Sequence, residues 1–149
     1  NPSPTRLVMR LVIIDTNVLI SGLLTREATS PTAEIVNAML SGGIAFLLSP
    51  ALLAEYRAVC TRPKIQKVHG MSEADVDSVL TEITANVIWR EPQVVLEAPD
   101  PGDNHLWTLL DTEPEATLIT GDQLLLNNPP SNRRVISPTD WIRELMKFG

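Results

Sequence analysis

Residues 11–17 read Leu11-Val12-Ile13-Ile14-Asp15-Thr16-Asn17, so four aliphatic side chains stand directly before a carboxylate, a hydroxyl and an amide. The mostly apolar run begins at Leu7. A continuous apolar run of this length is typical of a strand that is buried on both faces. We therefore predict a buried strand over residues 7–14 that ends at a carboxylate and leads into a loop or a helix.

Three Ser-Pro pairs mark the starts of later helices. Each pair offers a serine as the N-cap and a proline at the first helical position, where a missing N–H costs nothing. The pairs are Ser30-Pro31, Ser49-Pro50 and Ser137-Pro138. Gly42-Gly43 predicts the end of the first of these helices, and a short buried strand is expected over residues 44–48.

Strands and helices continue to alternate through the rest of the chain. Ser72 opens a segment that resembles a capping box, and Asp103 stands at or just before another helix start. Extended segments are predicted at residues 87–89, 94–96, 116–120 and 134–136. This alternation predicts an α/β protein, a three-layer α/β/α sandwich with a mainly parallel central sheet. In that architecture ligands bind at the carboxyl ends of the strands.

Length and composition predict one compact domain. A chain of 149 residues with 44% hydrophobic residues can bury about two-thirds of its unfolded surface. We expect residues 1–8 to be a flexible extension and residues 9–149 to form the domain. Cys60 has no partner cysteine, and the apolar runs are far shorter than a membrane helix requires. We expect a cytoplasmic protein that makes no contact with a membrane.

The net charge of −6 disfavours a protein that binds nucleic acid by neutralising many phosphates, because such proteins are usually basic. It is compatible with a metal-dependent nuclease, because divalent cations reverse the field around a group of acids.

Four acidic residues are expected at the carboxyl edge of the sheet. Asp15 and Asp122 each follow a predicted strand, Glu55 lies in the helix after the second strand, and Asp103 begins a later helix. Carboxylates that are packed together repel one another, and a cation relieves that repulsion. Magnesium prefers oxygen ligands and keeps several waters, so such a site can activate water against a phosphodiester.

Each acid also has a simpler interpretation. Asp15, Asp103 and Asp122 are residue types found at turns and helix caps, and Glu55 alone is typical of a solvated helix position. Asp100 stands three residues before Asp103 and competes with it as the third acid. The four acids carry an argument only together, because the predicted strands place them at one edge.

Four segments that contain these acids resemble the successive motifs of PIN-domain proteins. They are Ile13-Ile14-Asp15-Thr16-Asn17-Val18-Leu19-Ile20, Leu52-Leu53-Ala54-Glu55-Tyr56, Asp100-Pro101-Gly102-Asp103-Asn104 and Leu118-Ile119-Thr120-Gly121-Asp122. The resemblance extends from Met9 to about Trp141. Within that family the chain is most similar to the VapC-like toxin components of toxin–antitoxin systems. It departs from the family after Asp103, where an alanine-rich helix is usual and this chain has larger side chains.

The resemblance implies a Mg²⁺- or Mn²⁺-dependent endoribonuclease that is inhibited by a cognate antitoxin and forms a homodimer or a higher homo-oligomer. It also implies which residues form the site. The metal-binding and catalytic residues would be Asp15, Glu55, Asp103 and Asp122, with Thr16, Asn17, Thr120 and, as the competing acid, Asp100 in support.

Basic residues are densest just after Glu55. Arg57, Arg62, Lys64 and Lys67 are therefore candidates for guiding an RNA backbone to the acids. The alternative is a solvated helix end, because basic residues near a helix C-terminus also suit the helix dipole.

Three other classes of protein compete with the nuclease as interpretations of this sequence. A receiver domain has a pair of acids after its first strand, but Thr16 follows Asp15 here. A phosphatase with an aspartate nucleophile is expected to have a second acid two residues after the first, where this chain has Asn17. A catalytically inactive PIN-fold module that binds RNA or protein remains the alternative function.

Overall fold

Five parallel strands form the central sheet of the computed structural model, which describes residues 11–92 and 95–148 of the chain. The strands lie in the order β3-β2-β1-β4-β5, and every neighbouring pair is parallel. Their bounds are β1 Leu11–Ile14, β2 Ala45–Leu48, β3 Val87–Trp89, β4 Thr117–Ile119 and β5 Arg134–Ile136. The predicted α/β fold with a parallel sheet is therefore confirmed.

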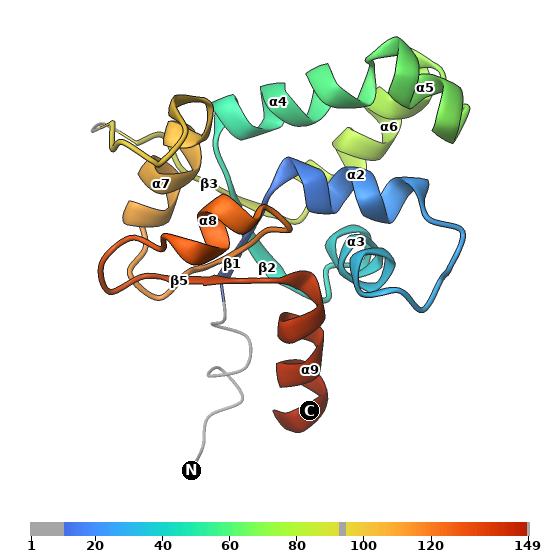
Figure 1. Cartoon of the computed structure of the whole chain (residues 1–149). Coiled ribbons are helices and arrows are strands. Elements are labelled where there is room, and N and C mark those ends of the chain that lie inside the picture. Colours follow the sequence, from blue (N-terminus) through green and yellow to red (C-terminus); the bar gives the residue numbers. More distant parts are fainter. Residues whose placement is uncertain (1–10, 93–94, 149) are drawn as a thin grey trace.

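Helices flank the sheet on both faces. Those between β1 and β3 are α2 Thr16–Leu24, α3 Pro31–Ser41, α4 Pro50–Cys60, α5 Pro63–His69 and α6 Glu73–Thr84. After β3 come the 3₁₀ turn η1 Pro101–Asp103, α7 Asn104–Asp111, α8 Gln123–Asn127 and α9 Pro138–Phe148. Right-handed connections place the helices before β3 on one face and α7 and α8 on the other. Figure 1 shows α7 and the α2–α3 pair on opposite sides of the strands.

The predicted helix starts are confirmed by their caps. Ser30 and Ser49 accept hydrogen bonds from the backbone N–H groups of Ala33 and Leu52, and Ser72 forms a complete capping box with Asp75. Ser137 accepts from the N–H of Asp140 at the start of α9. Gly42 ends α3 at φ +78°, in the left-handed region that glycine adopts at low cost.

Three parts of the fold differ from the sequence-based expectation. Two short helices, α5 and α8, were not expected. The strand predicted over residues 94–96 is wrong at 95 and 96, and Val94 lies outside the described residues. The reason is local, because the N–H of Leu96 donates to Thr108 Oγ1 at 2.9 Å, so this segment runs along α7. The predicted extension over residues 1–8 and the first part of the strand predicted over residues 7–14 lie outside the described residues.

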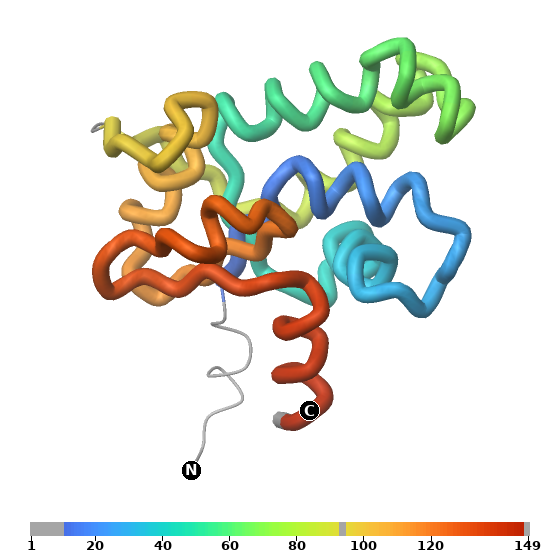
Figure 2. Tube along the Cα trace, viewed as in Figure 1, coloured from blue at the N-terminus to red at the C-terminus, as the bar shows by residue number. Residues whose placement is uncertain are grey.

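The first strand is the centre of the core. All four residues of β1 are buried, and β1 lies between β2 and β4. Figure 2 shows the early, blue part of the chain meeting the late, orange part at the middle of the molecule. Because all five strands are parallel, the residues that follow β1, β2 and β4 lie along one edge. In the described part of the chain, no helix is long and apolar enough to cross a membrane.

Candidate metal centre

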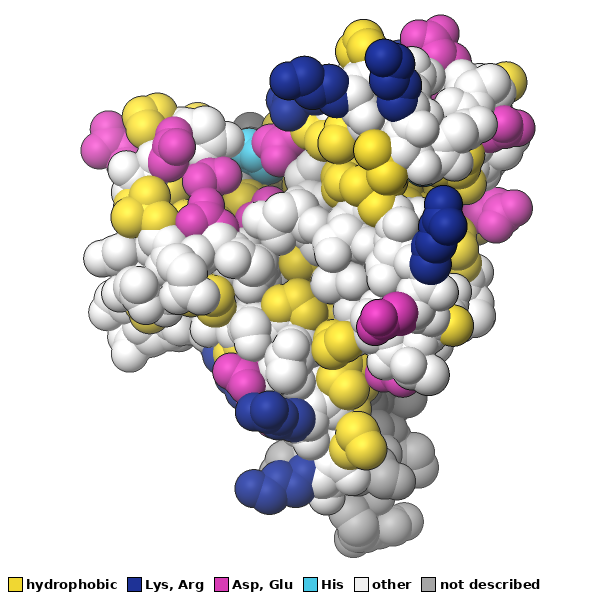
Figure 3. Space-filling model, turned by 45° about the vertical axis from the view of Figure 1, so that its right-hand side comes forward, with side chains coloured by type: hydrophobic (Ala, Val, Ile, Leu, Met, Phe, Trp, Pro, Cys, Tyr) yellow, Lys and Arg dark blue, Asp and Glu magenta, His cyan; other side chains and the backbone are white. Residues whose placement is uncertain are grey.

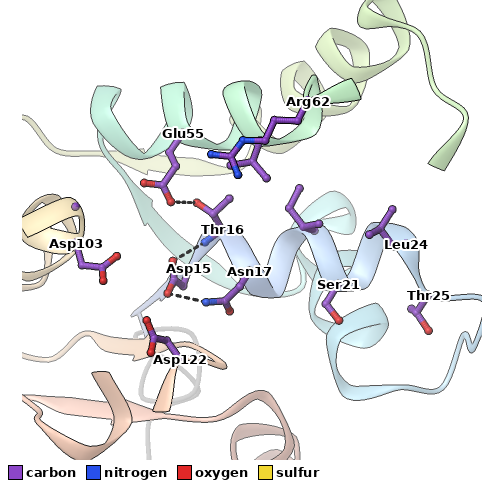
Figure 4. Close-up of a pocket in the computed structure, with 13 residues that line it drawn as sticks. Asp15, Thr16, Asn17, Ser21, Leu24, Thr25, Glu55, Arg62, Asp103 and Asp122 are labelled. Atoms are coloured by element: carbon purple, nitrogen blue, oxygen red, sulfur yellow. Dashed lines mark hydrogen bonds between the residues drawn. The ribbon is translucent and has the colours of Figure 1, made fainter. Parts of the chain in front are cut away.

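A hollow of about 830 Å³ opens at the carboxyl edge of the sheet. The four acids singled out in the sequence all line it: Asp15, Glu55, Asp103 and Asp122. Figure 4 shows these carboxylates coming from different elements and surrounding one space. The order of the strands, with β1 between β2 and β4, is what brings residues so distant in sequence together.

Asp15 is the most buried of the four acids. It is 4% exposed and caps α2, with Oδ1 accepting from the N–H of Thr16 at 2.7 Å. Its Oδ2 accepts from the Thr120 hydroxyl at 2.7 Å and from the Asn17 amide at 3.0 Å. Burial raises the pKa of Asp15, and the bonds from Thr120 and Thr16 oppose that rise. Three of the four residues expected to support the site, Thr16, Asn17 and Thr120, are thus the ones that hold this carboxylate.

Glu55 is fixed through both of its carboxylate oxygens. Thr16 Oγ1 donates to Glu55 Oε1 at 2.6 Å, and His105 Nε2 lies 2.8 Å from Glu55 Oε2. The hydrogen bond with His105 is the main cause that lowers the pKa of Glu55. Tyr56, the next residue, is fully buried and donates its hydroxyl to the backbone oxygen of Ile14, which ties α4 to the end of β1.

Sequence reasoning missed His105. The two partners are fifty residues apart, and only the packing of α7 beside α4 brings them together. The one cue in the sequence is that His105 follows Asp103 by two residues at the start of the same helix.

The structure separates the two competitors for the third acid. Asp100 uses Oδ1 to accept from the N–H of Gly102 at 2.9 Å, which caps η1, and it does not line the hollow. Asp103 makes no capping bond to α7, and it lines the hollow. The placement favours Asp103.

Asp103 has the most perturbed acidity of the group. Burial first, and then the charges of Asp15, Asp100, Asp122 and Glu55, raise the pKa of Asp103 to about 6. The neighbouring carboxylates are therefore close enough for their charges to act on Asp103.

Asp122 joins the site from the end of β4. It caps α8, with Oδ1 accepting from the N–H of Leu124 at 2.9 Å, and its own N–H donates to Thr120 Oγ1. The N–H of Gly121 donates to Asn17 Oδ1 at 3.0 Å. Asn17 and Thr120 thus link the segment after β1 to the segment after β4.

The donor set suits a hard divalent cation. Among the described residues, no three acidic, histidine or cysteine side chains are close enough, as placed, to share one ion directly. Mg²⁺ uses only one or two protein carboxylates directly and reaches others through its waters, so carboxylates spread around a hollow fit its needs. Burial is the first cause of the raised pKa of Asp103 and the neighbouring carboxylates are the second, and such a cation would oppose the second.

The four basic candidates do not act as one group. Arg62 lines the hollow, whereas Lys64 and Lys67 are exposed on α5 and do not. Arg57 pairs with Asp77, with 2.8 Å between Nε and Oδ1, and lines a separate groove between α4 and α6. Of the four basic candidates, Arg62 is therefore the one placed at the acids, because the phase of α4 turns Arg57 toward α6.

Comparison with known proteins agrees with the four motifs. The family model of the PIN domain matches residues 11–124, a span that contains all four acids and ends before β5 and α9. No curated protein matches this chain. PIN domains are typically metal-dependent nucleases and generally use divalent metals. Since the match covers most of the chain, the protein belongs to the PIN-domain family.

Proposed function

We propose that the protein is an endoribonuclease that hydrolyses RNA phosphodiester bonds with Mg²⁺ or Mn²⁺ held at Asp15, Glu55, Asp103 and Asp122. The observation that carries the proposal is the arrangement of these four carboxylates around one hollow at the carboxyl edge of a parallel sheet. When bound, a divalent ion at this place activates water and stabilises the charge that develops on a phosphodiester. Water attacks in line at a backbone phosphate of single-stranded or looped RNA, so no nucleophilic side chain is needed.

The side chains prepare this site before substrate arrives. The hydrogen bonds from Thr16, Asn17 and Thr120 fix the direction of both Asp15 oxygens. Glu55 stays ionised because its pKa is lowered, so its carboxylate keeps the negative charge that attracts a cation. Fixed acceptors of this kind need no rearrangement at the moment of reaction.

The finer assignment rests on the resemblance of the motifs. On that ground we propose that the protein is the toxin of a toxin–antitoxin pair, that it acts in the cytoplasm as a homodimer or a higher homo-oligomer, and that a cognate antitoxin inhibits it. We also propose that residues 9–149 form a single domain.

The test is Mn²⁺-dependent cleavage of an unstructured RNA by the wild type and by Asp15→Asn and Asp122→Asn. Mutation of a residue that only orients a metal ligand lowers metal affinity or activity roughly 10- to 100-fold. Loss of a ligand itself should cost more, so we expect each variant to cleave RNA about 100-fold more slowly or worse. Asp122→Asn is the cleaner variant, because Asp15 also accepts three hydrogen bonds. Asp140→Asn is the matched control, because Asp140 is exposed on α9, outside the hollow.

Calorimetric metal binding by the same proteins separates the alternatives. Equal cleavage by all four proteins would indicate a contaminating nuclease and contradict the assignment. Metal binding by the wild type without cleavage would instead favour an inactive module that binds RNA or protein.

A further inference from the structure

The hollow has a second end that the acids do not occupy. Away from the carboxylates it is lined by Ile20 and Leu24 of α2 and by Val59 of α4. Figure 4 shows Leu24 and Thr25 at the far end of α2 from Asp15. Leu24 and Val59 are only partly buried, so a bound ligand could contact them. Together with Ile20 they form the apolar floor of the hollow.

One basic side chain also lines the hollow. Of the described residues that line the hollow, Arg62 is the only basic one. Figure 4 shows the Arg62 side chain extending from just after the end of α4 back toward Glu55, and both residues line the hollow. In the described part of the chain Arg62 has no ion-pair partner, in contrast to Arg57, which is paired with Asp77. Figure 3 shows acidic side chains on one side of this face and, next to them, an apolar patch beneath basic side chains.

The hollow brings together three surfaces that suit the groups of a nucleic-acid strand: the acids, the apolar floor and Arg62. A cation held by the acids would attract one phosphate, the apolar floor suits the flat face of a base, and Arg62 suits the next phosphate. A hollow of about 830 Å³ lies within the range of sites that enclose small organic ligands. With a cation held by the acids, both charged parts of the hollow are positive, which suits a strand that carries a phosphate on either side of a base, whereas a peptide would need two anionic groups there.

We propose that the apolar floor of Ile20, Leu24 and Val59, together with Arg62, is a subsite for the nucleotide next to the cleaved bond. This inference rests on the proposed function, because it takes the acids as the place where the phosphodiester is cut. The base lies on the floor and its outer phosphate pairs with Arg62. The subsite selects single-stranded RNA, because in a duplex the base is stacked and paired and cannot reach a floor beside its own phosphate.

The first arm of the test measures binding of a phosphorothioate oligoribonucleotide, which resists hydrolysis, by fluorescence anisotropy in Mn²⁺. Arg62→Ala is compared with Arg57→Ala, a neighbouring arginine that lines a different groove. We expect Arg62→Ala to weaken binding roughly five- to tenfold and to reduce the slope of log affinity against log salt by about 0.7, the value for one phosphate contact on a single strand. Arg57→Ala is expected to leave that slope unchanged.

The second arm removes the contact between base and floor in two ways, by changing the protein or by removing the base from the RNA. Leu24→Ser is expected to weaken binding of the ordinary oligonucleotide roughly fivefold, because it removes the apolar surface under the base. It is expected to have no effect on an oligonucleotide that is abasic at the position next to the cleaved bond. Val68→Ser is the matched control, because Val68 is 63% exposed on α5, outside the hollow. The abasic oligonucleotide needs no variant, so it tests the floor even if Leu24→Ser folds poorly.

Cleavage of ordinary RNA, measured in parallel, separates this inference from the proposed function. Cleavage by the wild type with no difference between Arg62→Ala and Arg57→Ala, or with equal effects of Leu24→Ser on both oligonucleotides, would overturn the subsite and leave the nuclease intact. The expected binding pattern without cleavage would support the subsite and contradict the nuclease. Failure of the wild type to bind single-stranded RNA would overturn the subsite and favour a protein partner as the occupant of the hollow.

Discussion

At the scale of one residue, the carboxylate of Asp103 lowers the stability of the folded chain when it is ionised. Its pKa is raised to about 6 by burial and by the neighbouring carboxylates. A carboxyl group with a higher pKa in the folded chain than in the unfolded chain holds its proton more tightly when folded. Its contribution to stability is therefore full below the ordinary value of 3.8 and is lost as the pH rises through about 6.

We predict that Asp103→Asn raises the melting temperature of the metal-free protein at pH 8. Each kcal/mol of relieved repulsion is worth roughly 2 to 4 °C in a chain of this size. The gain should shrink as the pH is lowered below 6, because Asp103 is then neutral in the wild type as well. Thermal unfolding in the presence of a chelator, followed by circular dichroism at several pH values, measures both effects. A melting temperature that falls at pH 8 would show that Asp103 is not repelled in the folded chain.

At the scale of the elements, the site depends on how α4 is attached to β1. The Tyr56 hydroxyl donates to the backbone oxygen of Ile14, the last residue of β1, and the neighbouring Glu55 is held by Thr16 at the start of α2. A single turn of α4 thus contacts both the strand and the helix that carry the first motif.

We predict that Tyr56→Phe lowers the free energy of unfolding by about 1 to 2 kcal/mol, because it leaves the buried oxygen of Ile14 without this donor. Cleavage should fall by less than tenfold, because Thr16 and His105 still hold Glu55. Urea unfolding and steady-state kinetics measure the two effects, with Thr112→Val as a control for a hydroxyl that bonds to backbone away from the site. Unchanged stability would mean that this bond does not fasten α4 to the sheet.

The elements that could be predicted from sequence are those whose signals are local. Ser-Pro caps, a glycine stop and apolar runs indicated most of the helices and strands, because each signal lies within a few residues of the element it specifies. The placement of Asp15 and Asp122 followed from the same reasoning, since a parallel sheet brings strand ends to one edge. Short α5 and α8 were missed because each is too brief to show an apolar stripe.

Contacts between distant elements could not be predicted. The pairing of His105 with Glu55 depends on how α7 lies against α4, and the turning of Arg57 toward Asp77 depends on how α6 lies against α4. Sequence favoured Asp103 over Asp100 only because Asp103 stands directly before the apolar helix, and the geometry of η1 adds the physical reason, since Asp100 caps the turn and Asp103 makes no capping bond.

At the scale of the whole molecule, metal binding and folding are expected to be linked. Two of the carboxylates follow β1 and β4, one lies in α4 and one stands at the start of α7, so the hollow exists only when these elements have assembled around the sheet. A ligand that binds only the folded chain stabilises it in proportion to the logarithm of its concentration.

We predict that Mn²⁺ at about 100 times its dissociation constant stabilises the wild type by about 2.7 kcal/mol, which corresponds to roughly 5 to 10 °C in melting temperature. A chelator should reverse the rise. Asp122→Asn should lose most of it and Asp140→Asn should keep it, as differential scanning calorimetry will show. The same rise in all three proteins would place the ion elsewhere on the surface.

The central position of β1 also sets when this protein becomes active during its own synthesis. A ribosome makes β1 and its neighbour β2 early, whereas β4, the neighbour on the other side, comes after α7. A nascent chain that already carries Asp15 and Glu55 therefore lacks Asp122 and leaves one edge of β1 unpaired until β4 has also been made. Under the proposed function, the enzyme cannot cut the message from which it is being translated until that message has been read past the codon for Asp122.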